Sequence, residues 1–187
     1  MYYFLKIITI LFVCILTPCV VKGKKNIPKG KCIFCVNHKS NFDSVYLLSY
    51  FWRKQYILSK KELYDKKLLR PILKAMCTIP VDRAKPELST IKKCFSVLKN
   101  NKILTIFPEG TRNQTSEKLL PFKPGIIEIA LRSNAPVVPI AIKKKGRLFR
   151  INKIVVGKPI YFNQIDLGEN KVEKASDILR QELLKLL

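Results

Sequence analysis

The chain has 187 residues, of which 48% are hydrophobic, and it carries 36 Lys and Arg against 13 Asp and Glu. This length suits one domain with a core of its own, and the apolar fraction excludes a disordered chain. The formal charge of +23 favours an anionic partner, for which nucleic acid, an anionic membrane surface or an acidic protein would qualify. A lysine-rich surface without any partner would account for part of this charge, although lysine clusters recur, the longest at Lys143-Lys144-Lys145.

The N-terminal residues 1–21 are apolar apart from Lys6. As one helix they would extend about 31 Å, which is enough for a hydrocarbon core, but the uncharged residues 7–21 would extend only about 22 Å. Pro18 would bend or end such a helix. A signal peptide, a short spanning anchor and a segment lying in one leaflet all fit this pattern, and the poor cleavage site around Pro18 disfavours the first.

Basic residues follow this apolar stretch, whereas Lys6 alone precedes its uncharged part. Positive charge is retained on the cytoplasmic side of membranes, so we expect the bulk of the chain to be cytoplasmic. The sequence therefore predicts a membrane anchor or in-plane apolar helix over residues 1–21. A single catalytic domain is expected over residues 22–187, at the cytoplasmic face of the cell membrane.

From residue 32 onward, strand-like and helix-like runs alternate. The predicted strands cover residues 32–37, 55–59, 78–81, 103–107, 137–142 and 154–160. The predicted helices cover residues 42–52, 67–76, 86–100, 125–133 and 174–187. Such alternation predicts an α/β fold in which a central mixed, largely parallel sheet is flanked by helices.

Cys32 and Cys35 form a C-x-x-C pattern, which raises the question of a metal or redox site. Both cysteines lie in a predicted buried strand, where residues three apart point to opposite faces. A second C-x-x-C is missing from the sequence, so we expect no metal site and interpret these cysteines as reduced core residues.

His38, the only histidine, follows the first predicted strand. Ser40 or Asn41 is a natural N-cap for the next helix, which would place Asp43 in its first turn. Across this loop-to-helix junction the carboxylate can accept the Nδ1 proton and leave Nε2 free to take a proton from a hydroxyl. Taken alone, a surface histidine near an incidental aspartate would give the same pattern.

Further polar groups follow other predicted strands. Residues 107–112 read Phe-Pro-Glu-Gly-Thr-Arg, in which Gly110 permits close backbone approach and Arg112 could hold a phosphate through its guanidinium fork. Residues 78–83 read Thr-Ile-Pro-Val-Asp-Arg and end on Arg83. The strand over residues 137–142 carries no group for chemistry and is interpreted as core.

Together these four segments resemble the motifs of the lysophospholipid acyltransferase family: N-H-x4-D, I-P-V-D-R, F-P-E-G-T-R and V-P-I. They occur here in that order, and the resemblance covers residues 31–160. Cys77 and Asn113 depart from the family's usual Gly and Ser, but neither belongs to the pair of His38 and Asp43. The resemblance implies a glycerolipid acyltransferase-like fold.

The resemblance also implies roles for single residues. His38 and Asp43 match the family's catalytic pair. A further group matches positions associated with the glycerol-phosphate acceptor, namely Arg83, Glu109, Gly110, Thr111 and Arg112. Lys60 resembles a family lysine near the active site, although this match could shift to Lys61.

The function implied is transfer of a fatty acyl group from acyl-CoA or acyl carrier protein to the sn-2 hydroxyl of 1-acyl-glycerol-3-phosphate, which gives phosphatidic acid for phospholipid biosynthesis. No cofactor is expected. A related activity on glycerol-3-phosphate or a lyso-ornithine lipid would fit the same motifs. A basic nucleic-acid-binding protein would fit the charge, but no recognition motif or stacking aromatics accompany it.

Overall fold

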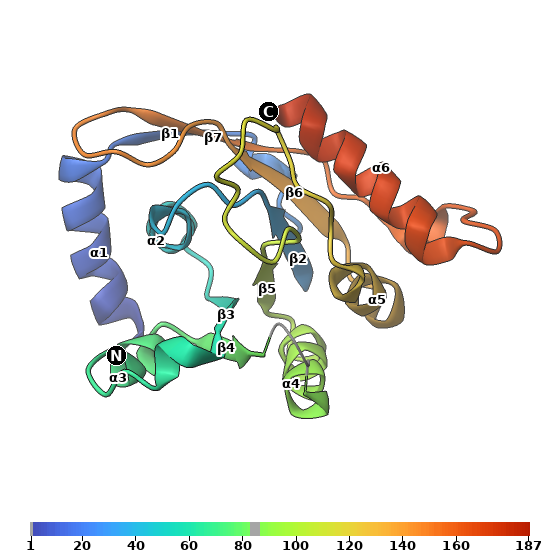
Figure 1. The fold of residues 1–187 in the computed structure, drawn as a ribbon, viewed down its shortest axis with the longest axis horizontal. Coiled ribbons are helices and arrows are strands. Elements are labelled where there is room, and N and C mark those ends of the chain that lie inside the picture. Colours follow the sequence, from blue (N-terminus) through green and yellow to red (C-terminus); the bar gives the residue numbers. More distant parts are fainter. Residues whose placement is uncertain (1, 83–86) are drawn as a thin grey trace.

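A seven-stranded mixed sheet forms the centre of the molecule (Figure 1). The computed structural model describes residues 2–82 and 87–187. The sheet has the order β1-β7-β6-β2-β5-β3-β4, and its neighbouring strands are parallel except for the antiparallel pair β6 and β7. The strands are β1 (Cys19–Lys22), β2 (Cys32–Val36), β3 (Gln55–Lys60), β4 (Thr78–Val81), β5 (Ile103–Ile106), β6 (Val137–Ile142) and β7 (Asn152–Val156). The predicted α/β fold with a largely parallel sheet is confirmed.

Helices cover both faces of this sheet (Figure 1). Apolar side chains of α1 (Tyr2–Leu16) and α2 (Phe42–Tyr50) pack on one face. The other face is covered by α4 (Leu88–Lys99), α5 (Pro124–Ser133) and α6 (Lys171–Leu186). The short α3 (Leu69–Ala75) lies beside the edge strand β4, and short 3-10 turns occur at Lys24–Asn26, Lys61–Tyr64 and Phe162–Gln164.

Strand β2 is buried along its whole length, because its side chains alternate between two apolar layers. Cys32 packs in the layer under α1 and α2, whereas Cys35 packs in the layer under α4 and α5. The two thiols of the C-x-x-C pattern therefore face opposite sides of the sheet, as expected. Burial raises the pKa of Cys32 to about 12 and that of Cys35 well above its usual value, so both thiols stay protonated.

The N-terminal helix is shorter than predicted. Helix α1 ends at Leu16, where Pro18 cannot continue the backbone hydrogen bonding. The expected helix over residues 1–21 is therefore wrong in its extent, because Cys19–Lys22 forms β1 and pairs in parallel with β7. Among the helices of the described residues, none is both long enough and apolar enough to cross a membrane.

Helix α1 is fastened to the end of α2 through a buried lysine. The ammonium of Lys6 donates to the carbonyl oxygens of Phe51, at 2.5 Å, and Trp52, at 2.7 Å. The same ammonium lies 5.7 Å from the ring centroid of Tyr2 and 5.4 Å from that of Trp52. Burial lowers the pKa of Lys6 to about 8, because the charged form loses its hydration. The single charge in the apolar segment is thus used to hold α1 against the domain.

Candidate active site

The carboxyl ends of β2, β5, β3 and β4 lie at one edge of the sheet, because these strands run in parallel. His38 follows β2, and the segment 107–112 follows β5. Lys60 is the last residue of β3, and Asp82 follows β4. Polar groups that lie far apart in the sequence therefore gather at the edge where α/β proteins bind ligands.

His38 and Asp43 are in direct contact across the junction between β2 and α2. The Nδ1 atom of His38 lies 2.9 Å from Oδ2 of Asp43, whose side chain is fully buried. The same oxygen accepts hydrogen bonds from the backbone N–H groups of Lys39, at 2.6 Å, and Ser40, at 2.7 Å. This carboxylate oxygen is placed to accept the proton on Nδ1 of His38, an arrangement that leaves Nε2 as the acceptor.

The start of α2 explains why this geometry is rigid. Ser40 accepts a hydrogen bond from the backbone N–H of Phe42 at 3.2 Å, while Asp43 reaches back to the N–H of Ser40. These hydrogen bonds across the start of α2 fix the aspartate that orients His38. Of the two predicted N-caps, Ser40 makes the side-chain bond and Asn41 does not.

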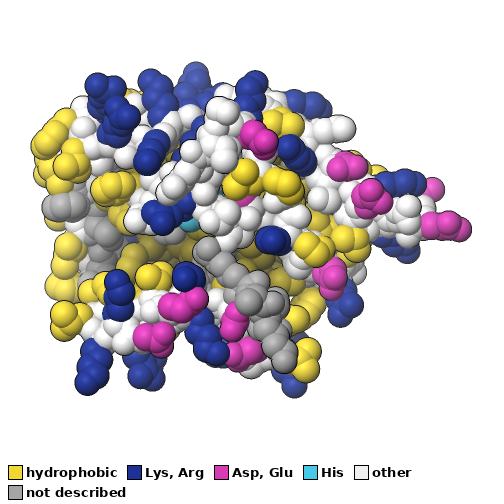
Figure 2. Space-filling view, viewed as in Figure 1, with side chains coloured by type: hydrophobic (Ala, Val, Ile, Leu, Met, Phe, Trp, Pro, Cys, Tyr) yellow, Lys and Arg dark blue, Asp and Glu magenta, His cyan; other side chains and the backbone are white. Residues whose placement is uncertain are grey.

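The imidazole of His38 is mostly buried and stacks on the ring of Phe107, with centroids 4.1 Å apart and an angle of 22° between the rings. The space-filling view shows the single histidine, in cyan, at the bottom of a hollow with hydrophobic side chains beside it (Figure 2). Phe107 thus shields one face of the ring from water.

Glu109 joins the loop after β5 to the loop that carries His38. Its carboxylate is buried, and its two oxygens accept hydrogen bonds from the backbone N–H groups of His38, at 2.8 Å, and Leu120, at 2.9 Å. The backbone N–H of Asn113 donates to the carbonyl of His38 at 2.7 Å. The structure therefore brings Glu109 to the backbone of His38, as a bridge between the two loops.

The remaining predicted residues of this loop lie at its surface. Gly110 adopts a left-handed conformation, with φ of +66°, in a turn closed by its N–H donating to the carbonyl of Phe107. Thr111 and Arg112 are exposed, and no hydrogen bond or ion pair is recorded for the Arg112 guanidinium within residues 2–82 and 87–187. Arg112 precedes Asn113, which places its backbone next to the His38 loop.

The basic residues expected near the site are less closely tied to His38. The ammonium of Lys60 lies 3.1 Å from the carboxylate of Glu62, and its side chain is half exposed. Lys61 instead pairs with Glu87 at 2.6 Å. Arg83 lies outside the described residues.

Asn37 is a positioning residue that sequence reasoning missed. Its amide oxygen accepts from the backbone N–H of Ile142 at 2.7 Å, and its amide nitrogen donates to the carbonyl of the same residue at 3.0 Å. Asn37 therefore ties the end of β2 to the end of β6, directly before the histidine. Its position ahead of His38 in the motif was the only available signal.

An apolar cavity of about 430 Å³ is lined in part by Phe107. Its walls come from the ends of β3 and β5 and from the facing sides of α4 and α5, and they include Leu58, Ile91, Phe95, Ile106, Gly125 and Ile129. Phe107 lines this cavity and also stacks on His38, so the same residue contacts both the cavity and the histidine.

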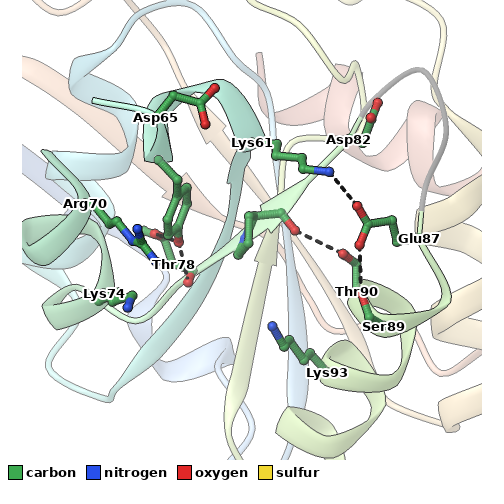
Figure 3. Close-up of a pocket in the computed structure, with 12 residues that line it drawn as sticks. Lys61, Asp65, Arg70, Lys74, Thr78, Asp82, Glu87, Ser89, Thr90 and Lys93 are labelled. Atoms are coloured by element: carbon green, nitrogen blue, oxygen red, sulfur yellow. Dashed lines mark hydrogen bonds and ion pairs between the residues drawn. The ribbon is translucent and has the colours of Figure 1, made fainter. Parts of the chain in front are cut away.

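A second cavity, of about 490 Å³, lies between α3, β4 and the start of α4 (Figure 3). Arg70 and Lys74 lie on one side of it, and the ion pair of Lys61 and Glu87 lies on the other (Figure 3). Asp65 and Asp82 also line it, so basic and acidic side chains are mixed. Within the described part of the chain, no group of three His, Cys, Asp or Glu side chains is arranged to hold a metal ion.

Comparison with known proteins shows the family to which the chain belongs. A family model described as Acyltransferase matches residues 19–143. The 1-acyl-sn-glycerol-3-phosphate acyltransferase of Bacillus subtilis is 35% identical over 153 residues, which are 75% of this chain and 73% of that protein. The enzyme of the same name from Saccharomyces cerevisiae is 33% identical over 132 residues, which are 68% of this chain and 44% of that protein.

More distant relatives extend the match. The chloroplastic 1-acyl-sn-glycerol-3-phosphate acyltransferase BAT2 of Brassica napus is 26% identical over 177 residues, which are 85% of this chain and 51% of that protein. The chain thus spans about half the length of the yeast and plant relatives.

The crystal structure of the 1-acyl-sn-glycerophosphate acyltransferase PlsC from Thermotoga maritima has the same fold, with a TM-score of 0.75 over 99% of this chain and 80% of that chain, at 22% identity. The family match includes the loops that carry His38, Asp43 and Glu109. The chain belongs to the acyltransferase family, of the 1-acyl-sn-glycerol-3-phosphate acyltransferase type.

Proposed function

We propose that this chain transfers a fatty acyl group from an acyl thioester to the sn-2 hydroxyl of 1-acyl-glycerol-3-phosphate, which gives phosphatidic acid. The observation that carries the proposal is the contact of 2.9 Å between His38 and Asp43, which leaves Nε2 of His38 as the free base. The names of the relatives support the acceptor, since they are called 1-acyl-sn-glycerol-3-phosphate acyltransferases.

In the proposed reaction, Nε2 of His38 takes the proton from the acceptor hydroxyl while the hydroxyl oxygen attacks the thioester carbonyl. The buried Asp43 carboxylate stabilises the imidazolium that forms. The tetrahedral intermediate then collapses, the carbon–sulfur bond breaks, and the thiolate takes the proton from the imidazolium. The products are the new ester and a free thiol, and His38 returns to its starting state.

The acceptor phosphate would be held by arginine side chains at the same edge of the sheet. Arg112 is exposed and lies next to the His38 loop in the structure, and a guanidinium fork suits a phosphate. Arg83, which lies outside the described residues, is proposed to assist. Lys60 would stabilise the oxyanion or the phosphate, because an exposed ion pair such as that with Glu62 contributes little and is easily exchanged.

Glu109, Gly110 and Thr111 would shape the loop that presents Arg112. The contacts of Glu109 favour a positioning role over direct contact with the acceptor, because both carboxylate oxygens already accept backbone N–H groups. Gly110 supplies the left-handed turn that follows it.

The fatty acyl chain would occupy the apolar cavity beside Phe107. The cavity is lined mainly by aliphatic and aromatic side chains, and its proximity to His38 would bring the thioester carbonyl to the base while the chain is kept out of water. The donor would be acyl-CoA or acyl carrier protein, and neither a cofactor nor a metal takes part in this scheme.

We further propose that the chain works at the cytoplasmic face of the cell membrane, where its acceptor is found. The outward side of α1 is apolar, with Phe4, Ile7, Leu11 and Ile15 all half exposed or more. The helix would lie in one leaflet, and the charge of +23 would attract the chain to anionic lipid.

An acceptor screen tests the reaction directly. Purified full-length chain is given a labelled acyl thioester, as acyl-CoA or acyl carrier protein, with lysophosphatidic acid, glycerol-3-phosphate and lyso-ornithine lipid offered separately. We expect labelled phosphatidic acid from lysophosphatidic acid alone. His38→Ala should remove turnover while thermal unfolding stays within a few degrees, and turnover retained by this variant would contradict the mechanism.

A further inference from the structure

The loop between β6 and β7, residues 143–151, is unusually basic. Five of its nine residues are Lys or Arg, and it contains no Asp or Glu. The basic side chains are Lys143, Lys144, Lys145, Arg147 and Arg150. Such a concentration of one sign creates a positive local potential that attracts anionic surfaces.

The same loop exposes large apolar side chains among its charges. Phe149 is 74% exposed, Ile151 is 64% exposed and Leu148 is 52% exposed. Phe149 also has a φ of +57°, a conformation that is costly for an aromatic residue. Its backbone is held in place because its N–H donates to the carbonyl of Leu16 at 2.5 Å. The aromatic ring is thus presented to solvent by a fixed backbone.

This loop continues the exposed apolar side of α1. The bond from Phe149 to Leu16 joins it to the C-terminal end of the helix. In the space-filling view, hydrophobic side chains follow the edge of the molecule where α1 lies, and Lys and Arg side chains crowd the adjoining border (Figures 1 and 2). An apolar strip bordered by basic groups is typical of surfaces that enter the headgroup region of a membrane.

The loop also contacts the elements that carry the catalytic pair. Gly146 is buried against α2, where a Cβ atom would meet Phe42 at 2.9 Å and Tyr46 at 3.1 Å. The ammonium of Lys39 donates to the carbonyl of Lys143 at 3.1 Å. The loop therefore lies between α1 and the His38 loop.

We infer that residues 143–151 form a second membrane contact, in which Leu148, Phe149 and Ile151 enter an anionic leaflet beside α1 while the basic residues bind its headgroups. The mixture of exposed apolar and basic side chains favours lipid over an acidic protein, because a docking site for carrier protein would not require an apolar wedge continuous with α1. With both contacts in place, the His38 loop is held at the level of the headgroups.

Vesicle binding of the full-length chain tests this inference without any need for turnover. Vesicles of phosphatidylcholine with 30% phosphatidylglycerol, on the order of physiological anionic content, would be compared with vesicles of phosphatidylcholine alone. Phe149→Asn should weaken binding to the anionic vesicles by about tenfold or more, because an aromatic anchor is lost. Since Asn tolerates a positive φ, thermal stability should be kept or raised, so lost binding cannot be ascribed to misfolding.

The matched control is Leu88→Asn. Leu88 is also 74% exposed, but it lies on α4, which packs on the opposite face of the sheet. For the charges, replacement of Lys144 and Lys145 by Gln should weaken binding about 25-fold, at about fivefold per charge near the surface. The same replacement at Lys92 and Lys93 on α4 should have little effect.

Insertion itself is measured with Phe149→Trp in a chain whose single tryptophan, Trp52, is replaced by Phe. Quenching of the introduced tryptophan's emission by brominated lipid is expected. Equal vesicle binding by Phe149→Asn and the unsubstituted chain would overturn the inference. The inference would also be overturned if the loop variants lost acyl transfer from acyl carrier protein but still bound vesicles like the unsubstituted chain. That result would make the loop a protein-docking site. His38→Ala should bind vesicles normally, so failure of the proposed reaction would be seen separately.

Discussion

At the scale of single residues, two buried carboxylates hold His38 in position. Asp43 orients the ring of His38, and Glu109 holds its backbone. His38, the proposed base, is therefore fixed through both its side chain and its main chain. Rigid placement of a general base matters because a small displacement from the reacting hydroxyl lowers the rate steeply.

Glu109→Gln tests the positioning role. The amide keeps one acceptor oxygen but loses the second, so one of the two buried backbone N–H groups is left unpaired. We expect a loss of about 1–3 kcal/mol in the free energy of unfolding. Steady-state kinetics should show a lower kcat with little change in the acceptor KM. Glu117→Gln, an exposed change in the same segment, is the control, and a raised acceptor KM for Glu109→Gln would favour direct binding instead.

Arg112→Ala should give the opposite kinetic pattern. The acceptor KM should rise about 10- to 100-fold, because a charge-assisted contact with the phosphate is removed, while the donor KM stays the same. The acceptor KM of Arg112→Lys should lie between those of the unsubstituted chain and Arg112→Ala, since lysine keeps the charge but not the guanidinium fork. An unchanged acceptor KM in the alanine variant would exclude the phosphate role.

Sequence motifs indicated the pair of His38 and Asp43 but did not reveal which other residues support it. The spacing of His38 and Asp43 made their contact possible, and the hydrogen bonds between Ser40 and Asp43 hold the carboxylate in place. The bridge by Glu109 and the stacking of Phe107 join loops that are distant in sequence. Such contacts depend on strand order, which local patterns do not encode.

At the scale of secondary structure, strand and helix positions were predicted to within a few residues from apolar periodicity and end signals. The miss was β1, because its apolar residues continue the apolar run of α1 without a change of composition. Pro18 marked the boundary, but only its partner β7 makes the segment a strand. The pairing with β7 makes residues 19–22 a strand, although their composition alone fits a helix equally well.

Lys6 gives the attachment of α1 a definite pH dependence. Its pKa of about 8 lies below the usual value of 10.5, so the unfolded chain binds more protons between these values. Stability should therefore rise with pH from about 8 to 10.

Lys6→Met should abolish this rise in stability with pH. Melting temperatures of the variant and of the unsubstituted chain, measured from about pH 8 to 10, give the size of the effect. Hydrogen exchange of α1 should also quicken in the variant, since the carbonyl groups of Phe51 and Trp52 lose a donor. A pH dependence identical in both chains would show that the lysine is not buried in solution.

At the scale of the whole molecule, the layers combine to form the cavity proposed for the acyl chain. Its lining runs from Leu58 to Arg132, so no single segment of the sequence indicated it. Gly125 lies in the wall, and a Cβ atom added there would meet nothing within 4 Å. A side chain can therefore be introduced at this position without a clash at its Cβ atom.

Gly125→Phe should shift donor preference toward shorter acyl chains, because the ring would occupy part of the cavity of about 430 Å³. Competition between thioesters of different chain length measures the shift. Gly125→Ala serves as the control for the loss of glycine and should keep the original preference. Retention of that preference by the phenylalanine variant would place the acyl chain elsewhere.

The pairing of β1 with β7 has a consequence for biosynthesis. Cys19 lies opposite Asn152, so the first strand of the sheet receives its partner only after most of the chain has left the ribosome. Until then, α1 and β1 lack part of the surface on which they pack. Exposed apolar segments in such intermediates are prone to aggregate. If α1 lies in a leaflet as proposed, a lipid surface close to the ribosome would cover it during this interval, and the membrane would then assist folding before it supplies the proposed substrate.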